Sequence, residues 1–445
     1  MPIISKLPAY NLKAVLKETG LKADVLRVWE RRYELPKPHR TVGGHRLYSD
    51  YDIETVKWLR GRQAEGLSIS RAVDLWKEIV AAGRDPLVEY PSASIPLAPD
   101  RQVVETRIDI LRQNWLDAIL AFDSDKVDEI LNQAFALYPV ETVCIDILQQ
   151  GISDLGNDWY LDKVSVQQEH FASALASRRL EALIASMPHP TRQQVVLVGC
   201  PSGEWHTFPT LILSLLLLRN GLKVVYLGAD IPIEQLEETS AATRPDLVVL
   251  AAQQLATAAT LRTTAVSLQR QGISLAYGGM IFNRVPGLRE HIPAYFLGET
   301  LDGAVHMIER LVTMPYPLST SIKVQEAYQG LARVFQEKRL FIETALLERL
   351  QENGLLIEFM GEANSFFGNG LSAALELGDP AFMEADLEWV QKLLTGRQIP
   401  AERLIPYLAA YSQSVQHVIG DVSKPIVEWI NSYVARNASK SQSVS

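Results

Sequence analysis

The chain has 445 residues and is 47% hydrophobic, which is enough material for roughly three domains that each bury a core. Two cysteines, no apolar signal core and no apolar run long enough for a bilayer exclude a disulfide-built secreted domain and a membrane protein, so we expect a cytoplasmic protein. The net charge is −9, yet residues 1–80 hold 15 Lys and Arg against 10 Asp and Glu; this basic head on an acidic body predicts one local contact with nucleic acid.

The first predicted domain, residues 1–84, combines helices with a basic hairpin. Helices are expected in four segments, and we expect Asp50 to cap the third and Ser68 the fourth. Between the second and third helices lies a hairpin built around Gly43-Gly44.

Basic side chains lie on both the second helix and the hairpin. Arg27 and Arg31 are four residues apart and share a helix face, while Arg40, Thr41 and Arg46 flank the glycine turn. Helix and hairpin therefore both present hydrogen-bond donors to phosphates, which predicts binding to double-stranded DNA.

This segment, residues 27–49, resembles the winged helix-turn-helix of the MerR family, in the version found in its light- and cobalamin-responsive branch. The resemblance implies a homo-oligomer, either a dimer or a tetramer, bound to an operator. It also implies five DNA contacts: Arg27, Arg31, Arg40, Arg46 and Tyr48.

Further regions follow the head and complete a multidomain fold with α and α/β parts. The prolines of residues 85–100 predict a linker without a helix, and residues 101–190 have the spacing of a four-helix bundle. In residues 191–318 short β-rich runs alternate with helices, which predicts a doubly wound parallel sheet. Residues 319–436 predict a C-terminal helical domain, with LGDPAFMEADLEWV echoing the bundle's AFDSDKVDEIL in rhythm, and residues 437–445 predict a disordered tail.

A histidine follows the first strand of the predicted sheet, in the loop GCPSGEWHTFPT. Such sheets bind ligands beyond the carboxyl ends of their strands, where His206 can direct a ring nitrogen toward a metal. Glu204, two residues earlier, can accept a hydrogen bond from the other ring nitrogen. The pair is typical of a metal ligand and the carboxylate that orients it, although a lone loop histidine is more often a surface or packed residue.

The sheet region resembles the cobalamin-binding fold of methionine synthase, of corrinoid carrier proteins and of CarH/LitR-type photoreceptor regulators, whose loop reads acidic-x-His-x-x-Gly. The resemblance implies that His206 is the lower cobalt ligand and that Gly278-Gly279 lets the nucleotide tail approach the backbone. In the bundle, Trp159 and, nine residues later, Glu169-His170 match the Trp-x9-Glu-His pattern of the photoreceptor regulators. By resemblance, Trp159 covers the adenosyl group, and Glu169 and His170 contact it or a neighbouring subunit.

The sequence departs from this pattern at three places. Pro209 stands where the family has glycine, and Ala251-Ala252-Gln253 stands where the family usually has Ser-x-Leu. Both changes bear on insertion of the nucleotide tail, although proline is tolerated where a helix begins. Tyr160 replaces the histidine that captures cobalt after photolysis in the best-known photoreceptor, which bears on the light response.

Together these features predict a transcriptional regulator, not an enzyme, whose operator binding is controlled by adenosylcobalamin, with light as a further input. The sequence contains no GxxxxGK[ST], no GxSxG and no Cys/His cluster with zinc spacing. Two alternatives stay open: a MerR-type regulator whose altered pocket holds another tetrapyrrole, a small ligand or no cofactor, and a corrinoid-carrying methyltransferase subunit, which has no use for a winged head. In the C-terminal helices, His417 and Trp389 are expected to serve packing rather than a ligand pocket.

Overall fold

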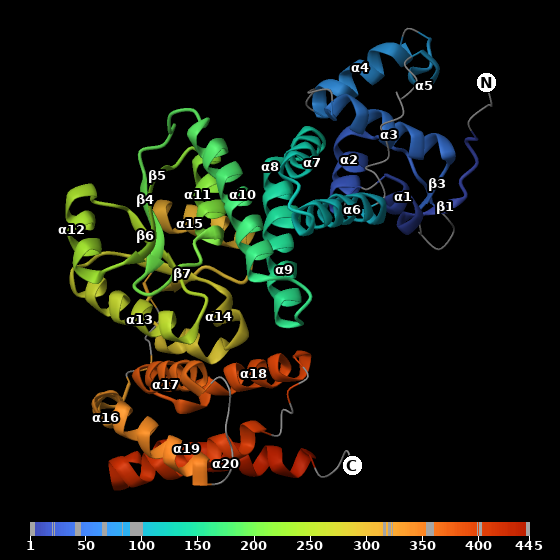
Figure 1. The fold of residues 1–445 in the computed structure, drawn as a ribbon. Helices are drawn as coiled ribbons and strands as arrows, with labels where there is room; N and C mark the ends of the chain where they lie inside the picture. The colour runs from blue at the N-terminus through green and yellow to red at the C-terminus, as the bar shows by residue number, and fades with distance from the viewer. Residues whose placement is uncertain are drawn as a thin grey trace. The chain divides into compact units, whose positions relative to one another are not determined.

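The computed structural model describes residues 5–19, 21, 23–40, 46–64, 69–81, 83–89, 101–314, 317–318, 322, 324–352, 360–397, 399 and 403–441. Two compact units are present, Met1–Arg107 and Ile108–Ser445, and each is described by itself (Figure 1). Among the described residues, no helix combines the length and the apolar character needed to cross a membrane.

The first unit is a helical head with a three-stranded sheet. β3 pairs antiparallel with both β1 and β2, so the predicted hairpin is present as a wing. Its turn, with Thr41 and Gly43-Gly44, lies outside the described residues. The elements in chain order are β1 (Tyr10–Asn11), α1 (Leu12–Thr19), α2 (Ala23–Tyr33), β2 (His39–Arg40), β3 (Arg46–Tyr48), α3 (Asp50–Ala64), α4 (Ile69–Ala81) and α5 (Pro86–Glu89).

The core of the head is built from large side chains that the amphipathic helices turn inward. Leu26 and Trp29 of α2 are buried there, and the rings of Trp58 and Trp76 meet edge to face with centroids 5.1 Å apart. Aromatic pairs in this geometry add to the free energy gained from burying their area. The core therefore fixes the orientation of α2, which carries Arg27 and Arg31.

Two local predictions in the head are wrong. Ser49, not Asp50, caps α3: the Ser49 amide and hydroxyl donate to Oδ2 of Asp52 at 2.8 and 2.7 Å, and the Asp52 amide donates back at 3.2 Å. This reciprocal pair satisfies backbone donors that Asp50, as the first helical residue, cannot reach. The expected linker begins with the helix α5, where Asp85 accepts the amide of Leu87 at 3.0 Å; Ser68 and residues 90–100 lie outside the described residues.

The second unit begins within α6 (Arg101–Leu120), the first helix of the predicted four-helix bundle. The third helix of the bundle is continuous but changes from α-helix to π-helix and back, so it is divided into the three consecutive elements α8, η1 and α9. Trp115, Ile119, Leu131 and Ile147 are fully buried between the helices. The elements are α6 (Arg101–Leu120), α7 (Ser124–Leu137), α8 (Val140–Thr142), η1 (Val143–Gln149), α9 (Gln150–Tyr160) and α10 (Val166–Ala185).

A five-stranded parallel sheet follows, in the order β5-β4-β6-β7-β8. Figure 1 shows α11 and α15 on one face of the sheet and α12 and α13 on the other, which confirms the doubly wound prediction. The strand order reverses beside β4, so the switch point lies between β4 and β6. The elements are β4 (Val195–Pro201), α11 (Phe208–Arg219), β5 (Lys223–Ile231), α12 (Ile233–Thr243), β6 (Leu247–Ala251), α13 (Leu255–Arg270), β7 (Leu275–Gly278), α14 (Met280–Arg284), η2 (Pro286–His291), β8 (Tyr295–Phe296) and α15 (Leu301–Thr313).

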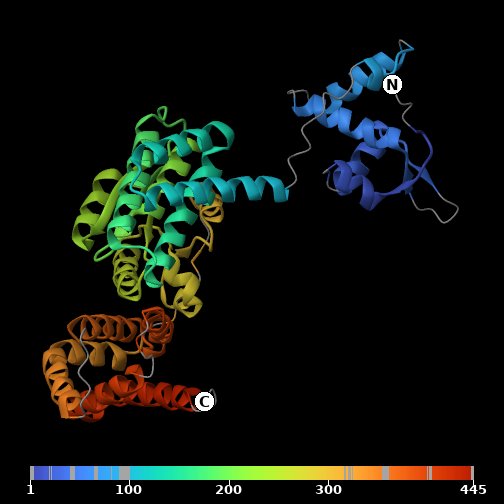
Figure 2. The ribbon, with the colours of Figure 1, turned by 45° about the vertical axis from the view of Figure 1, so that its right-hand side comes forward.

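The C-terminal helices share one continuous core with the sheet domain. α17 packs along α13, and Figure 2 shows the C-terminal helices, orange to red, beside that part of the sheet domain. An ion pair between Arg284 and Asp386 joins the two parts. The elements are α16 (Glu326–Glu352), α17 (Met360–Leu377), η3 (Pro380–Met383), α18 (Glu384–Gly396), α19 (Leu404–Ile419), η5 (Gly420–Ser423) and α20 (Lys424–Ser441).

Two further sequence predictions concern this C-terminal part. α20 extends to Ser441, so the disordered tail expected from residue 437 is wrong for residues 437–441, whereas residues 442–445 lie outside the described residues. Within the helix, Asn437 donates its side-chain amide to the Tyr433 carbonyl at 2.9 Å. The predicted echo has a local counterpart. Asp123 and Asp379 each cap the next helical element, each follows a residue of positive φ, and their amides donate to Ala118 and Ala374 at 3.0 Å.

Candidate ligand site at the sheet edge and candidate DNA contacts

The loop after β4 brings Glu204 and His206 together, as the sequence predicted. Oε1 of Glu204 lies 2.6 Å from Nδ1 of His206 and accepts the His206 backbone amide at 3.0 Å. The hydrogen bond to this carboxylate raises the pKa of His206, against the effect of burial. With Nδ1 donating to Glu204, Nε2 of the ring carries the lone pair, and the imidazole is 58% exposed. The ring is therefore presented with one nitrogen held and the other turned away from Glu204.

The second oxygen of Glu204 ties this loop to the loop after β6. Oε2 accepts the hydroxyl of Thr257 at 2.6 Å and the amide of Gln253 at 2.7 Å. Burial disfavours the charged carboxylate, but the hydrogen bonds from His206, Thr257 and Gln253 outweigh it and lower the pKa of Glu204. The carboxylate thus connects both sides of the switch point. Sequence reasoning missed Thr257, whose signal was its place three residues after Gln254, the N-cap of α13.

Gln253 extends the connection to the third loop of this edge. Its Oε1 accepts the amide of Met280 at 2.9 Å, at the start of α14 after β7. Its Nε2 is a buried nitrogen without a hydrogen-bond partner in the part of the chain that the structure describes. Such an unpaired buried donor is costly and is relieved by a ligand acceptor.

The two glycines at the end of β7, Gly278 as its last residue and Gly279 directly after it, differ in what surrounds them. Gly279 has φ +121°, and a Cβ there would lie 1.9 Å from the carbonyl oxygen of Ala252, so its need for glycine comes from the fold. A Cβ on Gly278 would meet nothing within 4 Å. Open space for an approaching ligand therefore lies at Gly278 and not at Gly279.

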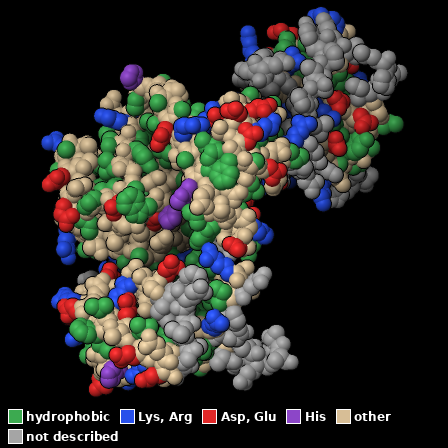
Figure 3. All heavy atoms as spheres, in the orientation of Figure 1, with side chains coloured by type: hydrophobic (Ala, Val, Ile, Leu, Met, Phe, Trp, Pro, Cys, Tyr) green, Lys and Arg blue, Asp and Glu red, His purple; other side chains and the backbone are tan. Residues whose placement is uncertain are grey.

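Large apolar side chains are exposed in the same loops. Trp205, between Glu204 and His206, is 70% exposed, and Met280 is 55% exposed. Figure 3 shows hydrophobic (green) and histidine (purple) side chains exposed on the surface of the second unit. Pro209 is accommodated in the first turn of α11, where its missing amide costs no helix hydrogen bond.

The bundle contributes a charge close to His206. Glu169, in the first turn of α10, lies near enough that its carboxylate also raises the pKa of His206. Glu169 accepts the hydroxyl of Ser173 at 2.7 Å, and its Oε2 lies 3.7 Å from Nε2 of the exposed His170. The negative charge of Glu169, in the bundle, therefore acts on His206, in the sheet domain.

Trp159 lies near the end of α9 and is half-buried. The guanidinium of Arg397, from the C-terminal domain, lies over its ring, 5.4 Å from the ring centroid. Sequence reasoning did not predict this contact, since the two residues are far apart along the chain. The side chain of Tyr160 lies outside the described residues.

In the head, the predicted DNA contacts fall into two groups. Arg27, Arg31 and Arg40 are exposed on α2 and β2. Arg46 is half-buried, with Nε 2.9 Å from Oε2 of Glu30. Tyr48 is 0% exposed and donates its hydroxyl to Glu30; burial and this bond raise its pKa. Tyr48 is therefore corrected from a DNA contact to a core residue.

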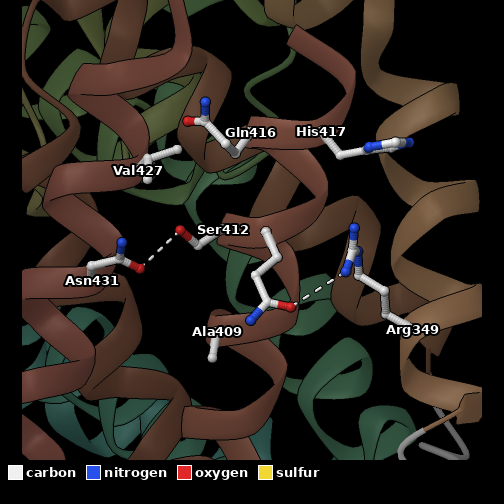
Figure 4. Close-up of a pocket in the computed structure, with 8 residues that line it drawn as sticks. Arg349, Ala409, Ser412, Gln416, His417, Val427 and Asn431 are labelled. Atoms are coloured by element: carbon white, nitrogen blue, oxygen red, sulfur yellow. Dashed lines mark hydrogen bonds between the residues drawn. The ribbon is translucent and has the colours of Figure 1, made fainter. Parts of the chain in front are cut away.

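A separate pocket of about 490 Å³ lies between α16, α19 and α20 of the C-terminal domain. His417 lines it, with Arg349 and Gln416, and Ser412 donates to Asn431 at 2.9 Å in its wall (Figure 4). His417 is thus at a pocket, whereas Trp389 packs against Phe366 with centroids 5.4 Å apart, as expected.

Two family models match the chain. One described as "MerR HTH family regulatory protein" matches residues 10–78, and one described as "B12 binding domain" matches residues 111–184, which is the helical bundle. The HTH-type transcriptional repressor CarA of Myxococcus xanthus is 31% identical over 242 residues, 54% of this chain and 75% of CarA. The repressor CarH of the same organism is 30% identical over 241 residues, 54% of this chain and 78% of CarH. Among solved structures, the monomethylamine corrinoid protein of Methanosarcina barkeri is similar with 19% identity and a TM-score of 0.38, over 44% of this chain and 95% of that one.

Proposed function

The chain belongs to the family of MerR-type transcriptional regulators with a B12-binding domain that includes CarA and CarH, and from this we propose that adenosylcobalamin bound at the sheet edge controls its binding to an operator. The observation that carries the proposal is the Glu204–His206 pair at the switch point, with the second ring nitrogen turned away from Glu204. Histidine oriented by a carboxylate in this way is the usual form of a metal-ligating imidazole.

The residues present fit a corrinoid. His206 would be the lower cobalt ligand through Nε2, with Glu204 holding the ring through Nδ1. Gln253 would offer its buried Nε2, which has no partner among the described residues, to an acceptor on the ligand, and Gly278 would leave room for the nucleotide tail. The exposed Trp205 and Met280 would lose contact with water when a large macrocycle covers them, which favours binding.

The bundle would cover the upper side of the ligand. We assign Trp159 to the adenosyl group, and Glu169 and His170 to contacts with that group or with a neighbouring subunit. The bound group would supply a cobalt–carbon bond that light breaks. Trp159, Glu169 and His170 would hold the upper group against the bundle while it is bound.

The head would provide the output. Arg27, Arg31 and Arg40 are exposed and would contact phosphates or base edges, with Arg46 supporting the wing. The proposed domains are a head of residues 1–84 extended by α5 at the start of the expected linker of 85–100, a bundle of 101–190, a sheet domain of 191–318 and a C-terminal domain of 319–436. In a homo-oligomer, dimer or tetramer, ligand-dependent association would set how many heads engage one operator.

Titration of the purified protein with adenosylcobalamin in the dark, followed by absorbance, tests the proposal. We expect a bound corrinoid spectrum, and an affinity at least about 100-fold lower for His206→Ala, because a ligand to the metal matters more than its hydrogen-bond partner. His306→Ala, which removes an 80% exposed histidine of α15, is the matched control. Absence of a corrinoid spectrum, or equal uptake by His206→Ala, contradicts the proposal. A haem spectrum of the protein as purified would favour another tetrapyrrole.

Operator binding and oligomeric state are then measured with and without adenosylcobalamin, before and after illumination. We expect DNA affinity and molecular mass to change together on addition of the cofactor, and to reverse in light. A cofactor that binds without changing either quantity would leave the protein a corrinoid binder but not a corrinoid-controlled regulator.

A further inference from the structure

The C-terminal domain is anchored to the sheet domain at one end of α18. Met383, directly before α18, is 0% exposed, and Asp386 in its first turn pairs with Arg284 of α14. Phe382 packs edge to face on His291, with centroids 5.1 Å apart. Asp386 is buried and the side chain of Arg284 is 35% exposed, so separating the two charges would leave the Asp386 carboxylate buried without its partner. The start of α18 is therefore fixed relative to the sheet.

The other end of α18 reaches the bundle. α18 and α9 are in contact, and Figure 1 shows them meeting at the edge of the C-terminal domain. Arg397 is the C-cap of α18, and its amide donates to the carbonyl of Leu393 at 3.1 Å, which holds its backbone. From this position its guanidinium lies over the ring of Trp159, 5.4 Å from the centroid. The contact joins a residue anchored to the sheet with the tryptophan assigned to the upper side of the cofactor.

A guanidinium over an indole face favours the ring orientation that presents that face to the cation. The attraction depends on the face being presented to the cation, so rotation of the ring breaks it. At an exposed site the contact changes a conformational equilibrium by about 2- to 5-fold. A ring held in this way pays less entropy when a ligand group stacks on it.

We propose that Arg397 is a positioning residue of the cofactor site, and that the C-terminal domain uses it to hold Trp159 in the orientation that receives the upper group. This inference rests on the proposed function, because it takes Trp159 as the cover of the adenosyl group. The C-terminal domain would then help to select between corrinoids. It would raise the affinity for corrinoids with a bulky upper group and leave the affinity for those without one unchanged.

Affinities of the full chain for adenosylcobalamin and for cyanocobalamin, measured in the dark, test the inference. Arg397→Ala is expected to weaken adenosylcobalamin binding by about 2- to 5-fold and to leave cyanocobalamin binding unchanged. Arg397→Lys keeps the cation without the planar group and should recover part of the loss. Lys392→Ala, which removes an exposed cation from the same helix, is the matched control.

A double-mutant cycle separates positioning from a general structural effect. In a Trp159→Leu background, Arg397→Ala should cause no further loss of adenosylcobalamin affinity, because the ring it positions is gone. Equal weakening for both corrinoids, an additive effect in the cycle, or no effect at all overturns the inference while the proposed function stands. Failure of the wild-type protein to bind adenosylcobalamin overturns the proposed function and this inference with it.

Discussion

The head and the sheet edge each contain a buried glutamate with several hydrogen-bond partners, and the two act in opposite directions. Glu30, with a side chain 9% exposed, draws Arg46 and Tyr48 of the wing toward α2. Glu204, 1% exposed, holds His206 by one ring nitrogen and leaves that ring 58% exposed. The first carboxylate takes side chains away from the surface, and the second presents one.

The difference lies in how much of each partner the carboxylate uses. The side chain of Tyr48 has one O–H proton, and once it is donated to Glu30 this buried side chain has no donor left for a phosphate. Arg46 is held through Nε, and His206 through Nδ1, so both retain nitrogen atoms that the bond to glutamate does not occupy. A side chain that is bonded to a buried carboxylate can still contact DNA or a ligand only when it has a second polar atom.

The largest expected effect is on stability, at Gly279. The neighbouring Gly278 is expected to affect ligand binding instead, so this pair tests whether the fold and the ligand depend on different residues. Gly279→Ala should lower the free energy of unfolding by about 3 kcal/mol or more, because an alanine at φ +121° is strained and its Cβ meets the Ala252 carbonyl. Gly278→Ala should leave stability nearly unchanged and weaken cobalamin binding. Chemical denaturation and cofactor titration of both variants measure this; equal losses of stability would show that the two glycines do not divide in this way.

Removing the charge of Glu204 tests whether the presented histidine depends on it. Glu204→Gln should weaken adenosylcobalamin binding by about 10- to 100-fold, because a neutral amide no longer fixes the tautomer and orientation of His206. Thr257→Val removes one donor to the same carboxylate and should have a smaller effect in the same direction. Absorbance titration gives both affinities. Wild-type affinity in Glu204→Gln would mean that the loop backbone alone orients the ring.

The corresponding change in the head should reduce stability by about 2 to 3 kcal/mol. Glu30→Ala leaves the hydroxyl of Tyr48 buried without its acceptor and the Nε of Arg46 without its ion pair. Glu34→Ala is the control, since its pair with Lys37 is 3.6 Å long and both side chains are over 70% exposed (73% and 78%). Denaturation followed by tryptophan fluorescence compares them; equal stability of the two variants would argue that Glu30 is only a surface partner.

The sequence was sufficient where the candidate site is built from residues close together in the chain. Glu204 and His206 are two residues apart, and the alternation of strands and helices predicted the sheet that places them. β8 was missed because Tyr295–Phe296 is too short to show a period. The burial of Tyr48 was missed because its partner Glu30 is on another element, and no local pattern indicates which wing residues turn inward.

Contacts between distant segments were beyond sequence reasoning for the same physical reason. Thr257 reaches Glu204 only because parallel strands bring the loops after β4 and β6 together. Arg397 reaches Trp159 only because the C-terminal domain packs on the sheet domain. The sequence of one segment indicates whether it forms a helix and where that helix is capped. Which two helices pack together depends on the shapes of both surfaces and is not visible in either segment alone.

The smallest expected effect concerns the residues of the head that Glu30 does not hold. Arg31→Ala should weaken operator binding by about 5-fold and reduce the salt dependence of binding by about one counterion, because an exposed arginine at this place would neutralise one phosphate. Arg46→Ala should lower stability as well as affinity, since it also breaks the pair with Glu30. Lys77→Ala, an exposed cation of α4, is the control for loss of charge. Binding isotherms at several salt concentrations give the salt slope, and an unchanged slope for Arg31→Ala would show that Arg31 does not contact DNA. Chemical denaturation gives the stability, and wild-type stability of Arg46→Ala would show that Arg46, like Arg31, serves DNA contact and not the fold.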